Sequence, residues 1–245
     1  MEEEGAFPAE LAAVVAEDLR TLAALQDREL DAAAIRALKT VGFPGSLGLL
    51  PEGEAMRRAV DLLARAIGQL PDALGPAELD ALAADYAAIY LTGALGASPC
   101  ESVWLSEDHL TCQEPMFEIR RLYAEHGLQA EDWRARPDDH LVLQLQFLAR
   151  RFEDGRGAGQ VRESARFLDE HLLRWIGDFA QRVASRCDTP FYAGLALLCA
   201  AYCDSLRDIL ARWLGEPRPS AEQIAERARP DPPAAPLRFV PGPGW

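Results

Sequence analysis

The spacing of apolar residues constrains this chain more than any other feature of its sequence. Apolar side chains recur three and four residues apart along almost the whole chain, and no stretch alternates apolar and polar residues as a strand would. A period near 3.6 places such residues on one face of a helix, and helices of this kind become stable when their apolar faces pack together. The sequence therefore predicts an all-α fold, a multi-helix bundle of 245 residues.

Gly and Pro residues interrupt this pattern and separate the expected helices from one another. We expect loops over residues 93–99 and 127–137, and three long amphipathic helices in the second half of the chain. The expected helices cover residues 8–26, 31–40, 54–70, 76–92, 113–126, 138–152, 161–186, 190–214 and 220–229.

Three parts follow from these breaks. We expect an N-terminal helical subdomain over residues 1–135 and a C-terminal helical subdomain over 136–215, joined by a loop at 136–140. Residues 216–245 contain eight of the 17 prolines. This composition predicts a Pro-rich tail that is extended beyond one short helix, either docked or disordered.

The net charge limits the kind of partner. The chain has 25 basic and 39 acidic residues, which gives a formal charge of −14. Such a charge repels a phosphate backbone, so we expect no binding of nucleic acid. A basic partner is the natural complement.

The location of the protein is predicted from its first residues and its longest apolar run. Residues 1–4 are acidic at the start of the chain, where a targeting segment would be positively charged. The longest apolar run, 191–202, is much shorter than the ~20 residues that cross a bilayer. We therefore expect a cytoplasmic protein without membrane insertion. Its five cysteines include no CxxC pair, and we expect Cys199 and Cys203, four residues apart, to be buried thiols rather than metal ligands.

Acidic residues are concentrated in one part of the chain. Residues 66–119 contain no Lys or Arg and carry −9 of the net charge. They either form a solvated surface or attract a basic ligand, and both interpretations stay open. The nine acids are Asp72, Glu78, Asp80, Asp85, Glu101, Glu107, Asp108, Glu114 and Glu118.

The segment Arg136-Pro137-Asp138-Asp139-His140 precedes an expected long helix. An Asp at this position commonly caps the first turn of a helix, and the residues alone favour that interpretation. The alternative is a binding role, because a carboxylate and an imidazole at a helix N-terminus suit a polar ligand.

A second segment, 98–109, combines a turn, a large aromatic residue and several polar groups. Pro99 and Trp104 are suited to contact an extended peptide, although Trp104 can equally belong to a packed loop. An alternative function, a metal-dependent hydrolase, would use two Asp-His pairs as ligands. Those ligands would be Asp108, His109, Asp139 and His140.

Several segments match a known family in the order in which they occur. Residues 86–90 resemble an aromatic-x-x-Leu-aromatic helix end, 99–105 resemble P-x-E-S-V-Y/W-L, and 137–141 match the end of E-P-x-D-H-L. Residues 116–127, 171–175 and 189–192 continue the series. The chain thus resembles the TorD/DmsD/NarJ family of chaperones that mature molybdenum-containing oxidoreductases. It departs from the family pattern at Arg136, where a Glu is usual, and at Gln144, where an acid is frequent.

The resemblance implies a fold of the TorD type and a cytoplasmic chaperone that is not an enzyme. Its partner would be the apo form of a molybdoenzyme catalytic subunit, bound through the twin-arginine signal peptide until the cofactor is inserted. It implies no cofactor or metal in the chaperone itself, and a monomer or homodimer. The alternatives from other classes are the metal-dependent hydrolase and a purely structural helical oligomer.

The expected binding site combines apolar and charged residues for an energetic reason. An exposed ion pair contributes about 0–1 kcal/mol, whereas a micromolar complex requires roughly 8 kcal/mol. Apolar contacts must supply the difference, and carboxylates such as Glu101 and Asp139 would bind the arginines. The expected apolar contacts are Tyr86, Ile89, Tyr90, Pro99 and Trp104. The other expected site residues are Glu101, Ser102, Pro137, Asp139 and His140.

Overall fold

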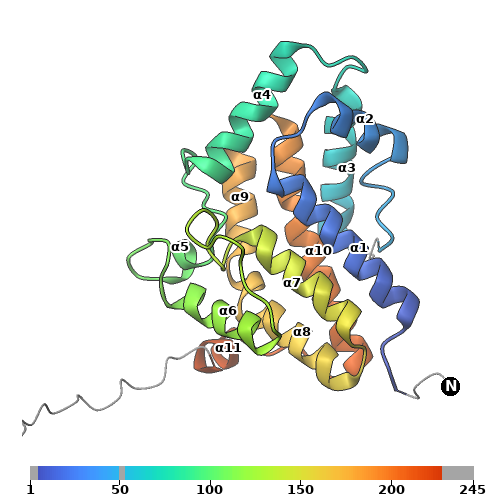
Figure 1. The fold of residues 1–245 in the computed structure, drawn as a ribbon. Coiled ribbons are helices and arrows are strands. Elements are labelled where there is room, and N and C mark those ends of the chain that lie inside the picture. The colour runs from blue at the N-terminus through green and yellow to red at the C-terminus, as the bar shows by residue number, and fades with distance from the viewer. Residues whose placement is uncertain (1–4, 50–52, 228–245) are drawn as a thin grey trace, which may run out of the picture.

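A computed structural model describes residues 5–49 and 53–227 as a bundle of helices (Figure 1). Within these two ranges there is no strand, and the predicted all-α fold is confirmed. The helices are α1 (Ala9–Asp27), α2 (Ala32–Val41), α3 (Glu54–Gln69), α4 (Pro76–Tyr86), α5 (Ser102–Leu105), α6 (Glu114–Glu125), α7 (Leu141–Asp154), α8 (Ala158–Glu170), α9 (Ile176–Arg186), α10 (Pro190–Leu214) and α11 (Ala221–Arg227). A π-helical turn, η1 (Ala87–Leu91), extends α4, and a 3₁₀ turn, η2 (Leu172–Arg174), separates α8 from α9.

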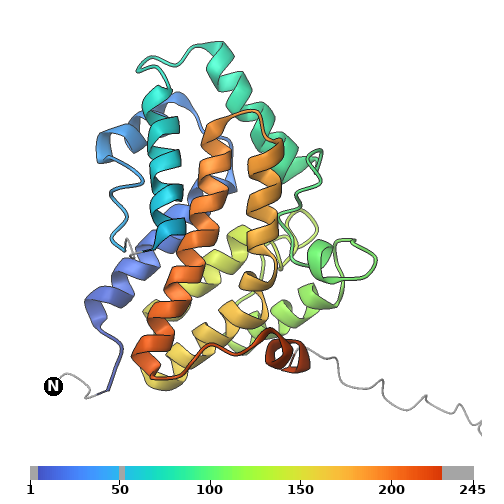
Figure 2. The ribbon, with the colours of Figure 1, turned by 180° about the vertical axis from the view of Figure 1, so that it is seen from behind.

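The longest helix, α10, lies at the centre of the bundle. It packs against α3 on one side and α9 on the other, as Figure 2 shows, and it also contacts α8. Helix α1 packs along α7. The apolar side chains between these helices form one buried cluster that extends from Phe7 to Leu210.

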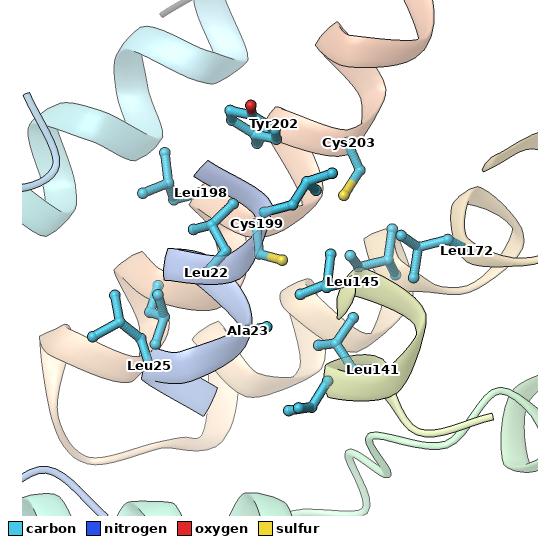
Figure 3. Packing of buried hydrophobic residues seen from close by; sticks show 14 of the residues in the cluster. Leu22, Ala23, Leu25, Leu141, Leu145, Leu172, Leu198, Cys199, Tyr202 and Cys203 are labelled. Atoms are coloured by element: carbon cyan, nitrogen blue, oxygen red, sulfur yellow. The ribbon is translucent and has the colours of Figure 1, made fainter. Parts of the chain in front are cut away.

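Three helices meet in the part of the cluster that Figure 3 shows from close by. Leu22 of α1, Leu145 of α7 and Leu198 of α10 are each fully buried. Burial of a Leu side chain stabilises a fold by about 1.5–3 kcal/mol, so this junction is a major source of stability. Both expected subdomains contribute to it, and the division of the chain at residue 136 stays a prediction.

The contact between α3 and α10 depends on a glycine. A Cβ atom placed on Gly194 would lie 2.9 Å from Leu63 Cα, which is closer than real Cβ atoms approach a backbone. The two helices therefore pack with their backbones close together, and only glycine fits at this position.

The expected helix over residues 161–186 is wrong, because the chain breaks at His171. This residue leaves the helical region, with φ −118° and ψ −85°, and the chain continues through η2 into α9. Neither Gly nor Pro occurs between residues 171 and 175, so the local sequence does not predict this break. A tertiary contact of His171, described below, is made at this point.

Three other expectations need correction. Helix α7 begins at Leu141, three residues later than expected, because Asp138 and Asp139 bond elsewhere. The end of the expected helix 76–92 is a π-helical turn. Residues 102–105, expected to lie in a turn or a packed loop, form the short helix α5.

The C-terminal part of the chain is described only as far as residue 227. Helix α11 confirms the short helix expected at 220–229, and the expectation for the Pro-rich tail beyond it falls outside the described residues. Among the helices of residues 5–49 and 53–227, none is both long enough and apolar enough to cross a membrane.

Candidate functional site

Two segments that the sequence analysis treated separately lie side by side in the structure. The backbone N–H of Leu141 donates to Pro99 O (2.7 Å), and that of Glu101 donates to Asp139 O (3.2 Å). Cys100 and His140 pair as an isolated antiparallel bridge. The 99–105 segment is therefore fixed to the 137–141 segment through the backbone.

The two neighbouring aspartates have different partners, and neither caps α7. Asp138 accepts two hydrogen bonds from Arg120, the shorter of 2.7 Å. Asp139 Oδ2 accepts from the backbone N–H of Ser102 (2.7 Å) at the start of α5. The expectation that an Asp caps the following helix is wrong, because His140 takes that role: its Nδ1 accepts from the N–H of Val142 (3.2 Å).

Burial changes the protonation of this segment. Asp139 is fully buried, and the loss of solvation raises the pKa of its carboxyl. Burial, helped by the charge of Arg136, lowers the pKa of His140 from 6.5 to about 3. His140 is therefore neutral at pH 7, which agrees with its role as a hydrogen-bond acceptor.

A buried polar network lies behind these residues. Gln144 Nε2 donates to Glu101 Oε2 (3.0 Å) and to Asp139 O (3.0 Å). The ring of His171, at the break between α8 and α9, is 3.0 Å from Glu101 Oε1 through Nδ1. The amide at position 144 fits here because it donates to Glu101, whereas an ionised acid would repel it.

Two acceptors of this network have no protein partner. Asp139 Oδ1 and Gln144 Oε1 are both buried and accept no hydrogen bond in the described structure. A buried polar group without a hydrogen-bond partner costs stability.

Next to this network lies a pocket of about 350 Å³. Its aromatic wall comes from the end of α4 and from η1, where Tyr86 and Tyr90 stand with ring centroids 5.0 Å apart. Tyr86 OH donates to Asp27 O (2.8 Å) and Tyr90 OH donates to Gln26 Oε1 (3.0 Å), which fixes both rings against the end of α1. Turns of π-helix are frequent at functional sites.

The structure brings most of the predicted site residues together. Six of them line the pocket: Tyr86, Ile89, Tyr90, Pro99, Pro137 and His140. Glu101, Ser102 and Asp139 are fully buried behind its wall. They hold the two segments in place, and a ligand arginine does not reach Glu101 or Asp139 in this conformation.

Trp104 lies beside the pocket rather than in it. It is half-buried, its indole N–H donates to Ser98 O (2.8 Å), and the guanidinium of Arg182 is 4.5 Å from its ring centroid. Trp104 packs on its own loop, as one interpretation expected. Part of its side chain is exposed, so a contact with a peptide, the other interpretation, stays a prediction.

Residues that the sequence analysis missed complete the pocket. Arg136 lines it and forms an ion pair with Asp27, at the end of α1. Its Nη2 also donates to Asp27 O (3.1 Å). Asp27 and Arg136 are 109 residues apart in the chain, so no local sequence pattern predicts this ion pair.

The acidic segment 66–119 does not form one surface. Asp85 and Glu101 are buried, and Glu78 accepts from the N–H of Gly75 (2.9 Å) at the start of its own helix. The exposed acids fall into two groups, one before and at the start of α4 and one in the loop after α5 and at the start of α6; Figure 1 places the start of α4 at the top of the bundle and α6 in its lower half. The second group consists of Glu107, Asp108 and Glu114, which flank the pocket residue Thr111 in the chain.

The metal-dependent hydrolase has no support in the structure. Within the described ranges, no three His, Cys, Asp or Glu residues are grouped as a metal site. His109 is exposed and its Nδ1 is 2.9 Å from Val103 O, while Asp139 and His140 are buried in bonds of their own. Cys199 and Cys203 are buried as expected.

Comparison with known proteins places this arrangement in a class of assembly chaperones. The family model described as nitrate reductase delta subunit matches residues 53–181. Chaperone protein TorD of Vibrio vulnificus is 30% identical over 190 residues, which cover 74% of this chain and 87% of that protein. TorD of Vibrio parahaemolyticus is 29% identical over 184 residues (72% and 85%), and TorD of Photobacterium profundum is 28% identical over 169 residues (66% and 76%).

The chain belongs to the TorD/DmsD/NarJ family of molybdoenzyme maturation chaperones. The matched range, 53–181, contains the π-helical turn, the 99–105 segment and the 137–141 segment. The resemblance inferred from the sequence is therefore confirmed, and the relatives named above are described as chaperones rather than as enzymes.

Proposed function

We propose that this protein binds the twin-arginine signal peptide of the apo catalytic subunit of a molybdoenzyme in the cytoplasm and holds that subunit while its cofactor is inserted. One observation carries the proposal: six residues chosen from the sequence for peptide binding line one pocket, although they come from segments 86–90, 99 and 137–140. The protein acts through binding, and no catalytic residue is assigned to it.

The pocket suits the apolar part of such a peptide. Two tyrosine rings and two prolines form the apolar part of its wall, and both tyrosine hydroxyls are already bonded. Leu91, 65% exposed on the rim, extends the apolar surface. Burial of apolar peptide residues supplies about 25 cal/mol for each Å² removed from water, which is the larger part of the affinity.

The exposed acids near the pocket suit the basic part. Glu107 and Asp108 lie in the loop that follows α5, and Glu114 begins α6. At the surface they attract a cationic segment and speed its association more than they strengthen the complex. The buried carboxylates of Glu101 and Asp139 keep the pocket wall in shape.

Calorimetry with a synthetic peptide tests this function. The peptide contains two adjacent arginines followed by an apolar stretch of about 15 residues, and its controls replace both arginines by lysines or by alanines. We expect binding of the first peptide, weaker binding of the lysine peptide because lysine cannot form paired hydrogen bonds, and the weakest binding of the alanine peptide.

A matched pair of variants tests the place of binding. Tyr90→Ala removes one ring of the pocket and should weaken binding at least tenfold, about 1.4 kcal/mol. Val41→Ala changes a residue of α2 that is 58% exposed and should bind as the wild type does. Equal affinity for the arginine and alanine peptides would refute the proposed function.

A further inference from the structure

Arg136 gives the pocket a positive charge, although its proposed ligand is a cationic peptide that would require a negative one. Of the described residues that line the pocket, it is the only one with a formal charge at pH 7, because His140 is neutral there. No Asp or Glu is among these lining residues. A pocket for an arginine-bearing peptide thus contains an arginine of its own.

The guanidinium of Arg136 occupies a set of acceptors at the end of α1. It pairs with Asp27 Oδ1 through Nη1 and donates to Asp27 O through Nη2 (3.1 Å). Asp27 is the last residue of α1, where backbone carbonyls lack helical partners and the negative end of the helix dipole favours a cation. The two tyrosine hydroxyls bond to Asp27 O and to Gln26 Oε1, so the acceptors are held in position from a second side.

These acceptors can be reached from solvent. The side chains of Asp27 and Arg136 are 37% and 35% exposed. By contrast, Glu101 and Asp139, which the sequence indicated as partners of the ligand arginines, are fully buried. Asp27 is therefore an accessible carboxylate that is bonded directly to the pocket residues Tyr86 and Arg136.

We propose that Asp27 receives an arginine side chain of the client peptide, and that Arg136 is an internal competitor which occupies this position in the free protein. The inference rests on the proposed function and adds a receptor residue and a specificity determinant to it. On binding, the guanidinium of the peptide replaces that of Arg136 on Asp27, and Arg136 moves into solvent.

The guanidinium of the peptide forms the same hydrogen bonds with Asp27 as that of Arg136. Arg136 therefore weakens peptide binding only because it competes for Asp27. Because Arg136 is tethered to the chain, it competes at the high effective concentration of an intramolecular group. A single free arginine side chain then competes poorly. A peptide that also buries apolar residues in the pocket competes well, and the arrangement selects for both features together.

The test compares variants of the full chain by calorimetry with the two-arginine peptide and its two-lysine control. Arg136→Gln removes the competitor, and we expect its affinity for the two-arginine peptide to rise by about threefold to tenfold. Asp27→Asn removes the receptor carboxylate, and we expect a loss of at least fivefold in both the wild type and Arg136→Gln. The gain for the two-lysine peptide should be smaller, because an ammonium does not reproduce the paired contact.

Arg28→Gln is the matched control. It removes the same charge from the residue next to Asp27, and its side chain is exposed. An equal gain in Arg28→Gln and Arg136→Gln would overturn the inference, because the effect would then be a general one of net charge. If Arg136→Gln melts below the assay temperature, Arg136→Lys replaces it. A lysine keeps the charge but loses the paired contact, so an intermediate gain is expected.

The proposed function and this inference fail in different ways. If neither the wild type nor any variant distinguishes the two-arginine peptide from the alanine peptide, the proposed function itself is wrong. If the wild type binds the two-arginine peptide but Arg136→Gln binds it no tighter, Arg136 does not compete. If Asp27→Asn binds as the wild type does, Asp27 is not the receptor.

Discussion

Asp18 and Asp139 are both buried carboxylates, yet they are bonded differently. Asp18, in α1, accepts from the N–H groups of Gly48 (2.9 Å) and Leu49 (2.8 Å) and from Tyr202 OH (3.0 Å), so both of its oxygens are occupied. Asp139 accepts one bond on Oδ2, and its Oδ1 has no partner in the described structure. Asp18 joins α1, the loop before α3 and α10 in the scaffold, whereas Asp139 joins two segments of the site.

The difference concerns how completely a buried carboxylate is bonded. Among the described residues, two other buried aspartates also have both oxygens bonded: Asp85, which accepts from Asp188 and Thr189, and Asp169, which accepts from Arg207. In the site, buried acceptors at Asp139 and Gln144 stay unused. Unused buried groups are not confined to the site, because Trp175 Nε1, Tyr192 OH and Arg207 Nη1 of the helical core also lack a partner in the described structure.

The largest effect that this comparison predicts is a pH dependence centred on His140. Its folded-state pKa, about 3, is below the unfolded value of 6.5. Its contribution to stability is therefore complete above pH 6.5 and is lost as the pH falls toward 3, in total on the order of 5 kcal/mol. Denaturant unfolding of the wild type and of His140→Asn, measured from pH 7 to pH 3, should show this loss in the wild type only, because Asn caps a helix without titrating. Parallel curves for the two proteins would contradict the assignment.

The next effect concerns the saturated carboxylate. Asp18→Ala leaves two backbone N–H groups and one buried hydroxyl without an acceptor, and we expect the free energy of unfolding to fall by about 3–5 kcal/mol. Asp18→Asn keeps one accepting oxygen and should lose less. The folded fraction of either variant should bind the two-arginine peptide with unchanged affinity. A clear loss of affinity would show that scaffold and site are coupled.

A smaller change in stability is expected from Asp139→Ala, which leaves the N–H of Ser102 at the start of α5 without its acceptor and costs about 1–3 kcal/mol. Asp138 does not replace it, because Asp138 is bonded to Arg120. The free energy of peptide binding should change more than the free energy of unfolding, because Pro99 and Cys100 of the 99–105 segment line the pocket. Calorimetry and thermal melting of the same sample separate the two effects, and unchanged affinity in the folded variant would refute a role for Asp139 in the site.

Asp139 also predicts a pH effect of the opposite sign to that of His140. Its pKa is raised in the folded state, so its contribution to stability is present below the ordinary value of 3.8 and is lost as the pH rises through the folded pKa. Asp139→Asn does not titrate, and its stability relative to the wild type should therefore increase as the pH rises from 3. A difference that stays constant over this range would contradict the raised pKa.

The smallest effect is kinetic and depends on the exposed acids near the pocket. A triple variant replaces Glu107, Asp108 and Glu114 by Gln. The two-arginine peptide should associate with it more slowly, and the association rate should depend less on ionic strength, with little change in the dissociation rate. Stopped-flow measurements between 0.05 and 0.5 M salt would show this. As a control, Asp72 and Asp80 near α4 are replaced in the same way, and this variant should associate as the wild type does. If the two variants slow association in proportion to the charges removed, three against two, total charge matters and the position of the acids does not.

The sequence predicted most of the helices and six of the residues that line the pocket. Apolar periodicity indicates a helix wherever one face is buried, and the limits of α10, Pro190 and Leu214, coincide with a proline at its start and a glycine after its end. The pocket residues were found because the family segments keep their order along the chain. Their convergence is what the structure adds.

The sequence alone did not indicate what each polar residue does. His171 breaks an otherwise regular helix, and its contact with Glu101 is 70 residues away in the chain. His140 caps α7 because both aspartates before it are bonded to other segments. A local sequence pattern indicates the propensity for a helix. A cap or an ion pair depends instead on which distant groups lie within hydrogen-bond distance in the folded structure.

For this protein, the order of apolar residues and the family segments determined the all-α fold, the class of chaperone and six residues of the pocket. Only the tertiary structure decided that Glu101 and Asp139 are buried supports, that the acidic segment divides into two groups, and that Arg136 lies on Asp27. Helix formation and apolar burial follow from the local order of side chains. Charge pairing and solvent access depend on which distant segments become neighbours, and that is decided only when the whole core is packed.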